Sequence, residues 1–327
     1  RQPGSSFKPL LYSVAIDNGL FPSFPISNEK FSRGGWSPNN ADGKSGGMVT
    51  LRKALAYSMN IPAARLMIFP KPGKPYVSPY QVVDLAKRLG IKSQLDPNPS
   101  IALGTSEVSP LELCSAIGSI AYEGKHADPI SILKVTDRNG LVLEQFQPKV
   151  VQAMEKTTAK IVSNMLEDVV EYGTASHVKS YFGGRAGGKT GTTQQSSDVW
   201  FVGYTQDLVA AVWVGFDDRR LKLPFSFGFG STGALPIWGS FMAEAYVSPA
   251  KYNIGYGSFG GLPEDVEHRD FCVESISRGE IRLAGPRCYN IVSDIIKKGK
   301  SIPVCDINHE LEENDKEIDD NTGVSGW

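Results

Sequence analysis

The chain of 327 residues is long enough for one large domain or two ordinary ones. Its hydrophobic content of 41% and charged content of 21% are typical of a globular protein with a sizeable core, and a formal net charge of −1 gives no indication of nucleic-acid binding. No apolar run reaches the roughly 18 residues that a membrane span needs, and the first residues lack the apolar stretch of a signal peptide.

The first predicted element is a helix from Ser5 to about Asn18, which follows a Pro-Gly turn. Pro9 is tolerated only in a first helical turn, so the helix must begin close to Ser5. The helix is apolar on almost every side, which predicts that it is buried in the middle of a domain. Ser5 and Lys8 are three residues apart and therefore face the same way, as a nucleophile and a candidate base.

A loop and a series of helices are expected next. Residues 22–47 are rich in Pro, Ser, Asn and Gly and predict a loop. A helix is expected from Thr50 to Tyr57 and another from Pro62, which leaves Ser58 and Asn60 on a tight turn between them. Further helices are expected over residues 79–89, 109–123 and 156–172.

Two β-hairpins interrupt the helical pattern. The first is predicted around Asn139-Gly140, and the second, strongly apolar, joins residues 198–204 to 208–216. A glycine-rich stretch leads into Lys189-Thr190-Gly191-Thr192 just before the second hairpin, and a last helix is expected from Pro236. Helices that lie between strand signals predict an α+β domain.

The last part of the chain has a different composition. Three cysteines, Cys272, Cys288 and Cys305, lie there without a Cys-x-x-Cys pair, so their spacing argues against a zinc site, and a disulfide among them remains open. Cys114, in an apolar helical run, is expected to be buried. The histidines are scattered and are expected at the surface, not as ligands; they are His126, His177, His268 and His309. Residues 306–327 are acidic and predict a disordered tail.

Three short motifs carry the chemistry, although each alone is weak. Ser-x-x-Lys also occurs at Ser27/Lys30 and elsewhere, and an isolated Ser5 would most simply be a helix cap. Ser58-x-Asn60 alone would be an ordinary turn. Lys189-Thr190-Gly191 occurs only once. The order of the three, with a buried helix, an interhelical turn and a strand as their settings, is the set found in penicillin-binding proteins and class A β-lactamases.

On these residues the chain resembles the transpeptidase domain of class A (bifunctional) penicillin-binding proteins over roughly residues 1–248. The stretches that carry the resemblance are residues 1–9, 56–63, 102–104, 188–193, 198–204 and 236–238. Residues 249–261 are then expected to be a linker, and residues 262–305 resemble the short cysteine-bearing C-terminal extension of some members.

The resemblance implies a penicillin-binding-protein and serine β-lactamase type of α+β fold, with a helical subdomain beside a central antiparallel sheet. A family member has further strands, a glycosyltransferase domain and a membrane anchor before the nucleophile. These are missing from this sequence, so we expect it to be part of a longer protein that is anchored on the periplasmic or extracytoplasmic face of the cell membrane. A chain extended upstream of Arg1 is expected to be more stable and to acylate faster.

The resemblance also implies roles for the motif residues. Ser5 is the expected nucleophile, Lys8 its general base and Ser58 the relay of a proton to the leaving amine. Asn60 is expected to hold the substrate backbone, and Lys189 is expected to stay charged and bind an anion.

The strand motif completes the expected site. Thr190 and Thr192 are expected to meet the terminal carboxylate of a peptide that adds to the strand edge, and Gly191 lets its backbone approach closely. The backbone N–H groups of Ser5 and Thr192 are the implied oxyanion hole. No metal and no cofactor are expected.

The implied reaction is D,D-transpeptidation. Ser5 would attack the D-Ala-D-Ala bond of a peptidoglycan stem peptide, and an amine of a neighbouring stem would resolve the acyl-enzyme. β-Lactams would trap the serine, and the machinery of cell-wall synthesis is the expected partner. Two alternatives remain open: a penicillin-sensing or peptidoglycan-binding domain that does not crosslink, and a serine β-lactamase. The chain lacks the Glu-x-x-x-Asn pattern of class A β-lactamases between Ser58 and Lys189, which argues against the second alternative.

Overall fold

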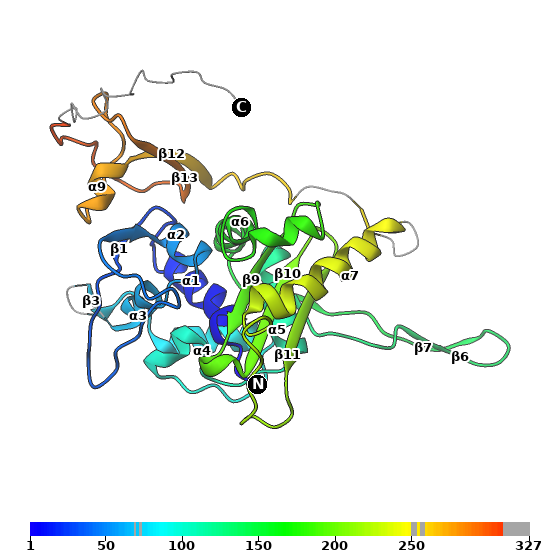
Figure 1. Ribbon diagram of the computed structural model, residues 1–327. Coiled ribbons are helices and arrows are strands. Elements are labelled where there is room, and N and C mark those ends of the chain that lie inside the picture. Colours follow the sequence, from blue (N-terminus) through cyan, green and yellow to red (C-terminus); the bar gives the residue numbers. More distant parts are fainter. Residues whose placement is uncertain (69, 72–73, 250–253, 256–258, 310–327) are drawn as a thin grey trace, which may run out of the picture.

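The computed structural model describes residues 1–68, 70–71, 74–249, 254–255 and 259–309. Its centre is an antiparallel sheet in the order β11-β10-β9, as predicted for the second hairpin (Figure 1). The three strands are β9 (Gly187–Thr192), β10 (Asp198–Tyr204) and β11 (Val209–Gly215). Because β9 pairs with β10 alone, its other edge has no strand partner within the described residues.

Helices cover both faces of this sheet. Tyr204 lies on the face of α5 (Pro110–Ala121) and α6 (Lys156–Glu171), where its hydroxyl meets Ser163 Oγ of α6 at 2.8 Å. Phe201 lies on the other face and packs edge-on against Trp238 of α7 (Leu235–Val247), with ring centroids 5.1 Å apart. Every residue of β10 is buried as a result, which explains its strongly apolar sequence.

The N-terminal helix is the centre of the helical part. The helix expected from Ser5 to Asn18 forms a 3₁₀ turn, η1 (Gly4–Phe7), followed by α1 (Lys8–Asp17). All residues of α1 except Asp17 are buried, as its apolar sequence predicts, and the helix packs against α2, α4 and α6. The first residue of this buried helix is Lys8, whose side chain is fully enclosed.

The predicted helices and the first hairpin form in this part within a few residues of their predicted limits, together with short elements that were not predicted. The helices are α2 (Leu51–Ala56), α3 (Asn60–Ile68), α4 (Pro79–Arg88), η2 (Pro99–Leu103), η3 (Ser176–Ser180), η4 (Gln194–Ser196) and the π-helical η5 (Gly230–Ala234). The short strands are β1 (Pro25–Ser27), β2 (Met48–Thr50), β3 (Pro70–Lys71), β4 (Lys74–Pro75), β5 (Lys125–Ala127), β6 (Lys134–Thr136), β7 (Val142–Gln145) and β8 (Val150–Gln152).

Two local predictions need correction. The stretch 22–47 contains β1, which pairs with β2, so it is not loop throughout. Helix α3 begins at Asn60 and not at Pro62, because Asn60 N donates to the side chain of Asn40 at 2.7 Å and is thereby capped from another segment.

Residues 262–309, here called the C-terminal module, contain more regular structure than their sequence indicated. β12 (Val266–Cys272) pairs antiparallel with β13 (Ile291–Lys297), and the short helix α9 (Val273–Ser277) follows β12. The module lies beside β2, α2 and α6 (Figure 1). Its Phe271 stacks on Phe21, with ring centroids 5.3 Å apart.

A buried ion-pair network joins the module to the helices. Arg52 of α2 donates to Asp294 of β13, with Nε 3.1 Å from both carboxylate oxygens, and to Asp168 Oδ2 of α6 at 2.6 Å. Burial opposes the charge, but the carboxylates of Asp294 and Asp168 outweigh it and raise the pKa of Arg52. Asp294 is only 3% exposed, so neither partner can lose the other without leaving a buried charge.

Several expectations for single residues were wrong. His126 is buried and contacts Ser119, and the side chain of His309 is only 7% exposed and lies among the three C-terminal cysteines. Cys114 is half-buried. The predicted acidic tail lies largely outside the described residues. His309 falls within the predicted range of the tail but is part of the module, where it contacts the three cysteines. The predicted domain limits otherwise stay a prediction. Among the described helices, none has the length and apolar character to cross a membrane.

Candidate active site

The Lys8 side chain connects the first two motifs. Its Nζ lies 2.7 Å from Asn60 Oδ1, 2.6 Å from the carbonyl oxygen of Ser58 and 3.1 Å from that of Met59. It lies 3.5 Å from Ser58 Oγ. The helix that follows Ser5 is thus fastened to the α2–α3 turn through a fully buried amine.

Lys189 of β9 reaches the same turn from the sheet. Its Nζ donates to Ser58 Oγ at 2.8 Å and to the carbonyl oxygen of Thr190 at 3.1 Å. Ser58 Oγ therefore lies between two lysine amines that come from different elements. Lys8, Ser58, Asn60 and Lys189, all predicted from the sequence, form one hydrogen-bonded group.

Burial and mutual repulsion change the acid–base properties of both lysines. The pKa of Lys8 is well below its ordinary value, mainly because of burial and in addition because of the charge of Lys189. Burial lowers the pKa of Lys189 to about 7. Burial thus opposes the expected charge of Lys189, whereas a bound anion would favour it, so that expectation stays a prediction. Within the described residues, no carboxylate forms an ion pair with either lysine.

The turn that carries Ser58 has a strained backbone. Ser58 has a φ of 57°, in the left-handed region that non-glycine residues rarely adopt and that is enriched at functional sites. Asn40 supports the turn, because its Oδ1 accepts from the backbone N–H groups of Asn60 and Ile61 at 2.7 and 3.1 Å. The role of Asn40 could not be predicted from the sequence, since an asparagine in a Pro- and Gly-rich loop carries no signal that it is buried.

The turn that carries Ser5 is pressed between the sheet and η2. A Cβ on Gly191 would lie 2.4 Å from the carbonyl oxygen of Pro3, and a Cβ on Gly104 would lie 2.1 Å from that of Gly4. Both positions therefore require glycine. The expected role of Gly191 changes accordingly, because the side of its Cα that lacks a side chain faces the nucleophile turn and not an approaching ligand.

Ser5 keeps access to solvent in this confined turn. Ser5 is half-buried, whereas the other residues of η1 are buried. No hydrogen bond joins Ser5 Oγ to any group among the residues with described positions, and Lys8 Nζ is instead held by the Ser58–Asn60 turn. The structure thus brings Ser5 and Lys8 to one end of α1 without a direct bond between them.

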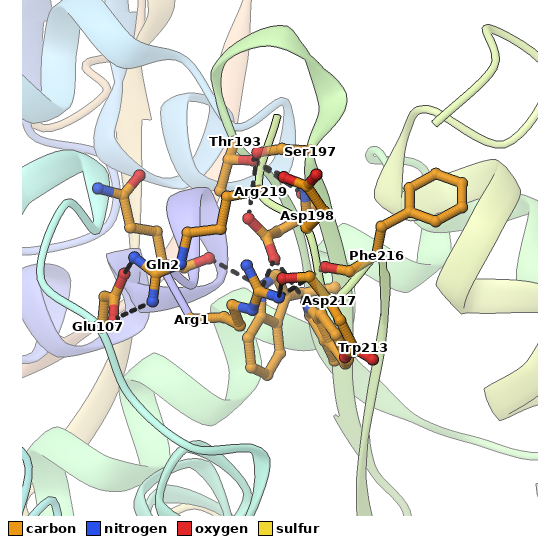
Figure 2. A network of polar contacts seen from close by, with 12 residues as sticks. Arg1, Gln2, Glu107, Thr193, Ser197, Asp198, Trp213, Phe216, Asp217 and Arg219 are labelled. Carbon is orange, nitrogen blue, oxygen red and sulfur yellow. Dashed lines mark hydrogen bonds and ion pairs between the residues drawn. The ribbon is translucent and has the colours of Figure 1, made fainter. Parts of the chain in front are cut away.

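A second polar network fixes the residues before Ser5 (Figure 2). The guanidinium of Arg1 lies over the ring of Trp213, 5.3 Å from its centroid, and donates to the carbonyl oxygen of Phe216 at 2.6 Å. The carbonyl oxygen of Gln2 accepts from Trp200 Nε1 at 2.8 Å. Asp198 accepts from Trp213 Nε1 at 2.8 Å and thereby orients the ring under Arg1. The strand ends of β10 and β11 thus hold the chain that leads to the nucleophile.

The two threonines of the strand motif differ in their surroundings. Thr190 is buried, and its hydroxyl meets that of Thr174 at 2.8 Å. Thr192 is half-buried, and its Oγ1 accepts from Gly230 N at 3.1 Å. Thr174 is a further residue that the sequence did not reveal. Of the two hydroxyls, that of Thr192 has the easier access to a ligand.

The structure combines a solvent-accessible serine with two buried lysine amines, on an α+β fold in which one edge of the central sheet has no strand partner among the described residues. Comparison with known proteins agrees with it. The family model for the penicillin binding protein transpeptidase domain matches residues 1–221, which is more than half of the chain. The chain belongs to this family.

Curated relatives show the same relationship. The chain is 36% identical over 258 residues to penicillin-binding protein 1A of Neisseria lactamica, a match that covers 75% of this chain and 31% of that protein. It is 38% identical over 251 residues to penicillin-binding protein 1A of Aquifex aeolicus, covering 74% and 33%. The matched part is thus about a third of the length of these relatives.

Solved structures share the fold. Penicillin-binding protein 1A of Haemophilus influenzae matches with a TM-score of 0.78 at 23% identity, over 93% of this chain and 49% of that one. The PonA1 protein of Mycobacterium tuberculosis, solved in complex with penicillin V, matches with a TM-score of 0.68 at 27% identity, over 81% and 73%. The predicted α+β transpeptidase fold is confirmed.

Proposed function

We propose that the chain is a D,D-transpeptidase that crosslinks peptidoglycan stem peptides through an acyl-enzyme on Ser5 and is inhibited by β-lactams. The observation that best supports this is Ser58 Oγ between Lys8 and Lys189, together with Ser5, the residue of η1 that keeps solvent access, one turn before Lys8. Two buried amines with lowered pKa values can exchange protons near neutral pH, as acyl transfer to and from a serine requires.

Acylation begins with proton removal from the nucleophile. Lys8, as the neutral amine, takes the proton of Ser5 Oγ while this oxygen forms a bond with the carbonyl carbon between the two D-alanines. The backbone N–H groups of Ser5 and Thr192 stabilise the negative charge that develops on the carbonyl oxygen, and each donor lowers the barrier by about 3–4 kcal/mol. The C–N bond then breaks.

The leaving D-alanine needs a proton. Ser58 donates its hydroxyl proton to the amine and recovers one from Lys8 or Lys189, both within 3.5 Å of its Oγ. Lys189 and Thr192 bind the terminal carboxylate, while Asn60 and the open edge of β9 hold the peptide backbone. The bound carboxylate favours the charged form of Lys189.

Deacylation completes the crosslink. An amine of a neighbouring stem peptide attacks the ester carbon and loses a proton to Lys8, which passes a proton to Ser5 Oγ as the C–O bond of the ester breaks. A β-lactam acylates Ser5 by opening of its ring amide; since the leaving amine stays attached, the adduct blocks the acceptor. The full-length protein is then also a peptidoglycan glycosyltransferase, anchored in the membrane with this domain on its outer side, among the enzymes of cell-wall synthesis.

The two alternatives are less well supported. A class A β-lactamase needs a carboxylate to activate the hydrolytic water, and no carboxylate bonds to Lys8, Ser58 or Lys189 in the described parts of the chain. A pure sensing domain requires no proton relay to a leaving amine, yet Ser58 is held between two amines.

The test is incubation with a synthetic stem pentapeptide ending in D-Ala-D-Ala, with a D-amino acid as acceptor. The proposal predicts release of D-alanine and formation of the exchanged peptide, both lost in Ser5→Ala and retained in the control Ser180→Ala, which changes an exposed serine. Penicillin acylation without any peptide product would identify a sensing domain, and rapid turnover of penicillin would identify a β-lactamase; either result would overturn the proposal.

A further inference from the structure

Four side chains of the C-terminal module converge on one point. Cys272, Cys288, Cys305 and His309 each offer one ligand atom, and these atoms all lie within 4.8 Å of one another. His309 Nε2 is 3.6 Å from Cys272 Sγ, 3.3 Å from Cys288 Sγ and 3.4 Å from Cys305 Sγ. The three sulfurs therefore surround the imidazole nitrogen at almost equal distances.

Separate elements bring these residues together. Cys272 ends β12 and caps α9, and its N–H donates to the carbonyl oxygen of Arg282 at 3.1 Å. Cys305 lies beside the same segment, because its N–H donates to Leu283 O at 2.8 Å. Cys288 closes a turn in which its N–H donates to Gly285 O at 3.0 Å. The convergence is thus a product of the module's fold and not of local sequence.

The separations match those of a tetrahedral metal site. With Zn–S bonds of about 2.3 Å and Zn–N bonds of about 2.0 Å, a regular tetrahedron places sulfur and nitrogen about 3.5 Å apart and two sulfurs about 3.8 Å apart. The three observed S–N separations of 3.3 to 3.6 Å fit this arrangement. A disulfide would leave one sulfur and the histidine without a role, and all of these cysteines are free.

The surrounding groups are those of a metal–thiolate centre. The backbone N–H groups of Ser275 and Gly285 donate to the sulfurs of Cys272 and Cys288 at 3.4 and 3.2 Å. Glu274 Oε2 lies 2.5 Å from His309 Nδ1 and so fixes the ring with Nε2 toward the sulfurs. A carboxylate on the far nitrogen of a metal-binding histidine is a common second layer of zinc sites.

We propose that Cys272, Cys288, Cys305 and His309 bind one structural Zn²⁺ ion that holds the C-terminal module together. Four protein ligands complete the tetrahedron and leave no position for a substrate, as in structural zinc sites. Binding releases the thiol protons of the three cysteines and forms three Zn–S bonds and one Zn–N bond. The expectation of no metal, drawn from the missing Cys-x-x-Cys pair, is replaced by this proposal.

The module's small core explains why it needs such a link. Its buried apolar cluster consists of Phe271, Ile276 and Ile296 with Phe21 from the neighbouring part. A unit of this size rarely folds stably on apolar burial alone, and a metal is one of the usual supplements. The ion would tie the end of β12 to the segment 283–309, at the side of the sheet away from the Arg52 network.

The first experiment measures metal content. The whole chain, purified under reducing conditions without added zinc, should contain about one zinc ion per chain by elemental mass spectrometry. Cys288→Ser and His309→Ala should lose it, whereas the control Cys114→Ser, a half-buried cysteine far from the module, should retain it. Cobalt substitution should produce the intense visible absorption of a tetrahedral cobalt–thiolate centre.

A graded variant keeps the test independent of misfolding. Glu274→Gln leaves all four ligands in place and removes only the carboxylate behind His309, so zinc affinity measured by chelator competition should fall by about 10–100-fold. Unchanged affinity would contradict the role of Glu274 in orienting the ligand. A chain without zinc, with all three thiols open to alkylation or with two of them in a disulfide, would overturn the proposal.

Discussion

The candidate active site and the C-terminal module are held together by opposite means. In the active site, Lys8 and Lys189 are fully buried without a carboxylate partner among the described residues, and the backbone of Ser58 is strained. The module instead pairs its buried Asp294 with Arg52 and gathers four ligand side chains at one point. A site with such energetic costs can form where a large core supports it, whereas a small unit depends on cross-links.

The largest expected effect is the loss of acylation rate when the general base is removed. Lys8→Met should slow penicillin acylation by about 10²–10⁴-fold, since the general base is lost. Lys8→Arg should not restore it, because a guanidinium does not lose its proton at working pH. Stopped-flow acylation with a fluorescent penicillin measures both. In the unmodified chain the rate should rise with pH as Lys8, whose pKa is held well below its ordinary value by burial and by the charge of Lys189, loses its proton; a flat profile would exclude Lys8 as the base.

The next effect concerns the link between the two regions. Asp294→Ala leaves the buried guanidinium of Arg52 with Asp168 as its one carboxylate partner, beside the amide of Asn164, and should lower the free energy of unfolding by about 3–5 kcal/mol. Urea unfolding measures the change. The matched control is Asp218→Ala, which removes an exposed ion pair and should leave the urea midpoint almost unchanged. Equal effects of the two substitutions would contradict a buried network.

Removal of the buried charge of Lys189 should stabilise the folded chain. Lys189→Met should abolish crosslinking but raise the unfolding free energy at pH 6 by about 2–4 kcal/mol, since the folded state no longer buries a charge and loses only a few hydrogen bonds. The folded pKa of about 7 lies below that of the unfolded chain, so the gain should be greatest below pH of about 7 and vanish toward about 10.5. Urea unfolding across this pH range measures the gain. If the gain is absent, the buried Lys189 does not destabilise the folded state.

The smallest expected effect is steric. Gly191→Ala forces a Cβ to within 2.4 Å of Pro3 O, so the Ser5 turn must shift, and acylation should slow by about 10–100-fold, equivalent to about 1–3 kcal/mol. Gly183→Ala, where a Cβ would meet nothing within 4 Å, should leave the rate unchanged. Similar rates for all three proteins would show that the turn is not tightly packed against β9.

The same contrast explains what the sequence could predict. Helix α5 was predictable because its signals are local: Ser109 and Glu112 form a capping box and Pro110 begins the helix. The active-site residues were predictable because they occupy three short stretches whose order is itself informative. The resemblance to a known family then supplied their roles.

The remaining features depend on contacts between distant segments. Nothing in the sequence near Asn40 indicates that it caps the turn at Asn60, and the side of Gly191 that faces the nucleophile turn depends on how α1 meets the sheet. The Cys and His cluster escaped detection because its members lie at 272, 288, 305 and 309, the last in a stretch whose acidic composition predicts a tail. Tertiary structure decides each of these cases.

The most direct test of the central claim is to locate the penicilloyl group. The chain should gain the mass of one penicillin, and fragmentation of the peptide that contains Ser5 and Ser6 should place the adduct on Ser5. An adduct on Ser6, on Ser58 or outside the active site, or no stable adduct at all, would contradict the assignment of Ser5 as the nucleophile.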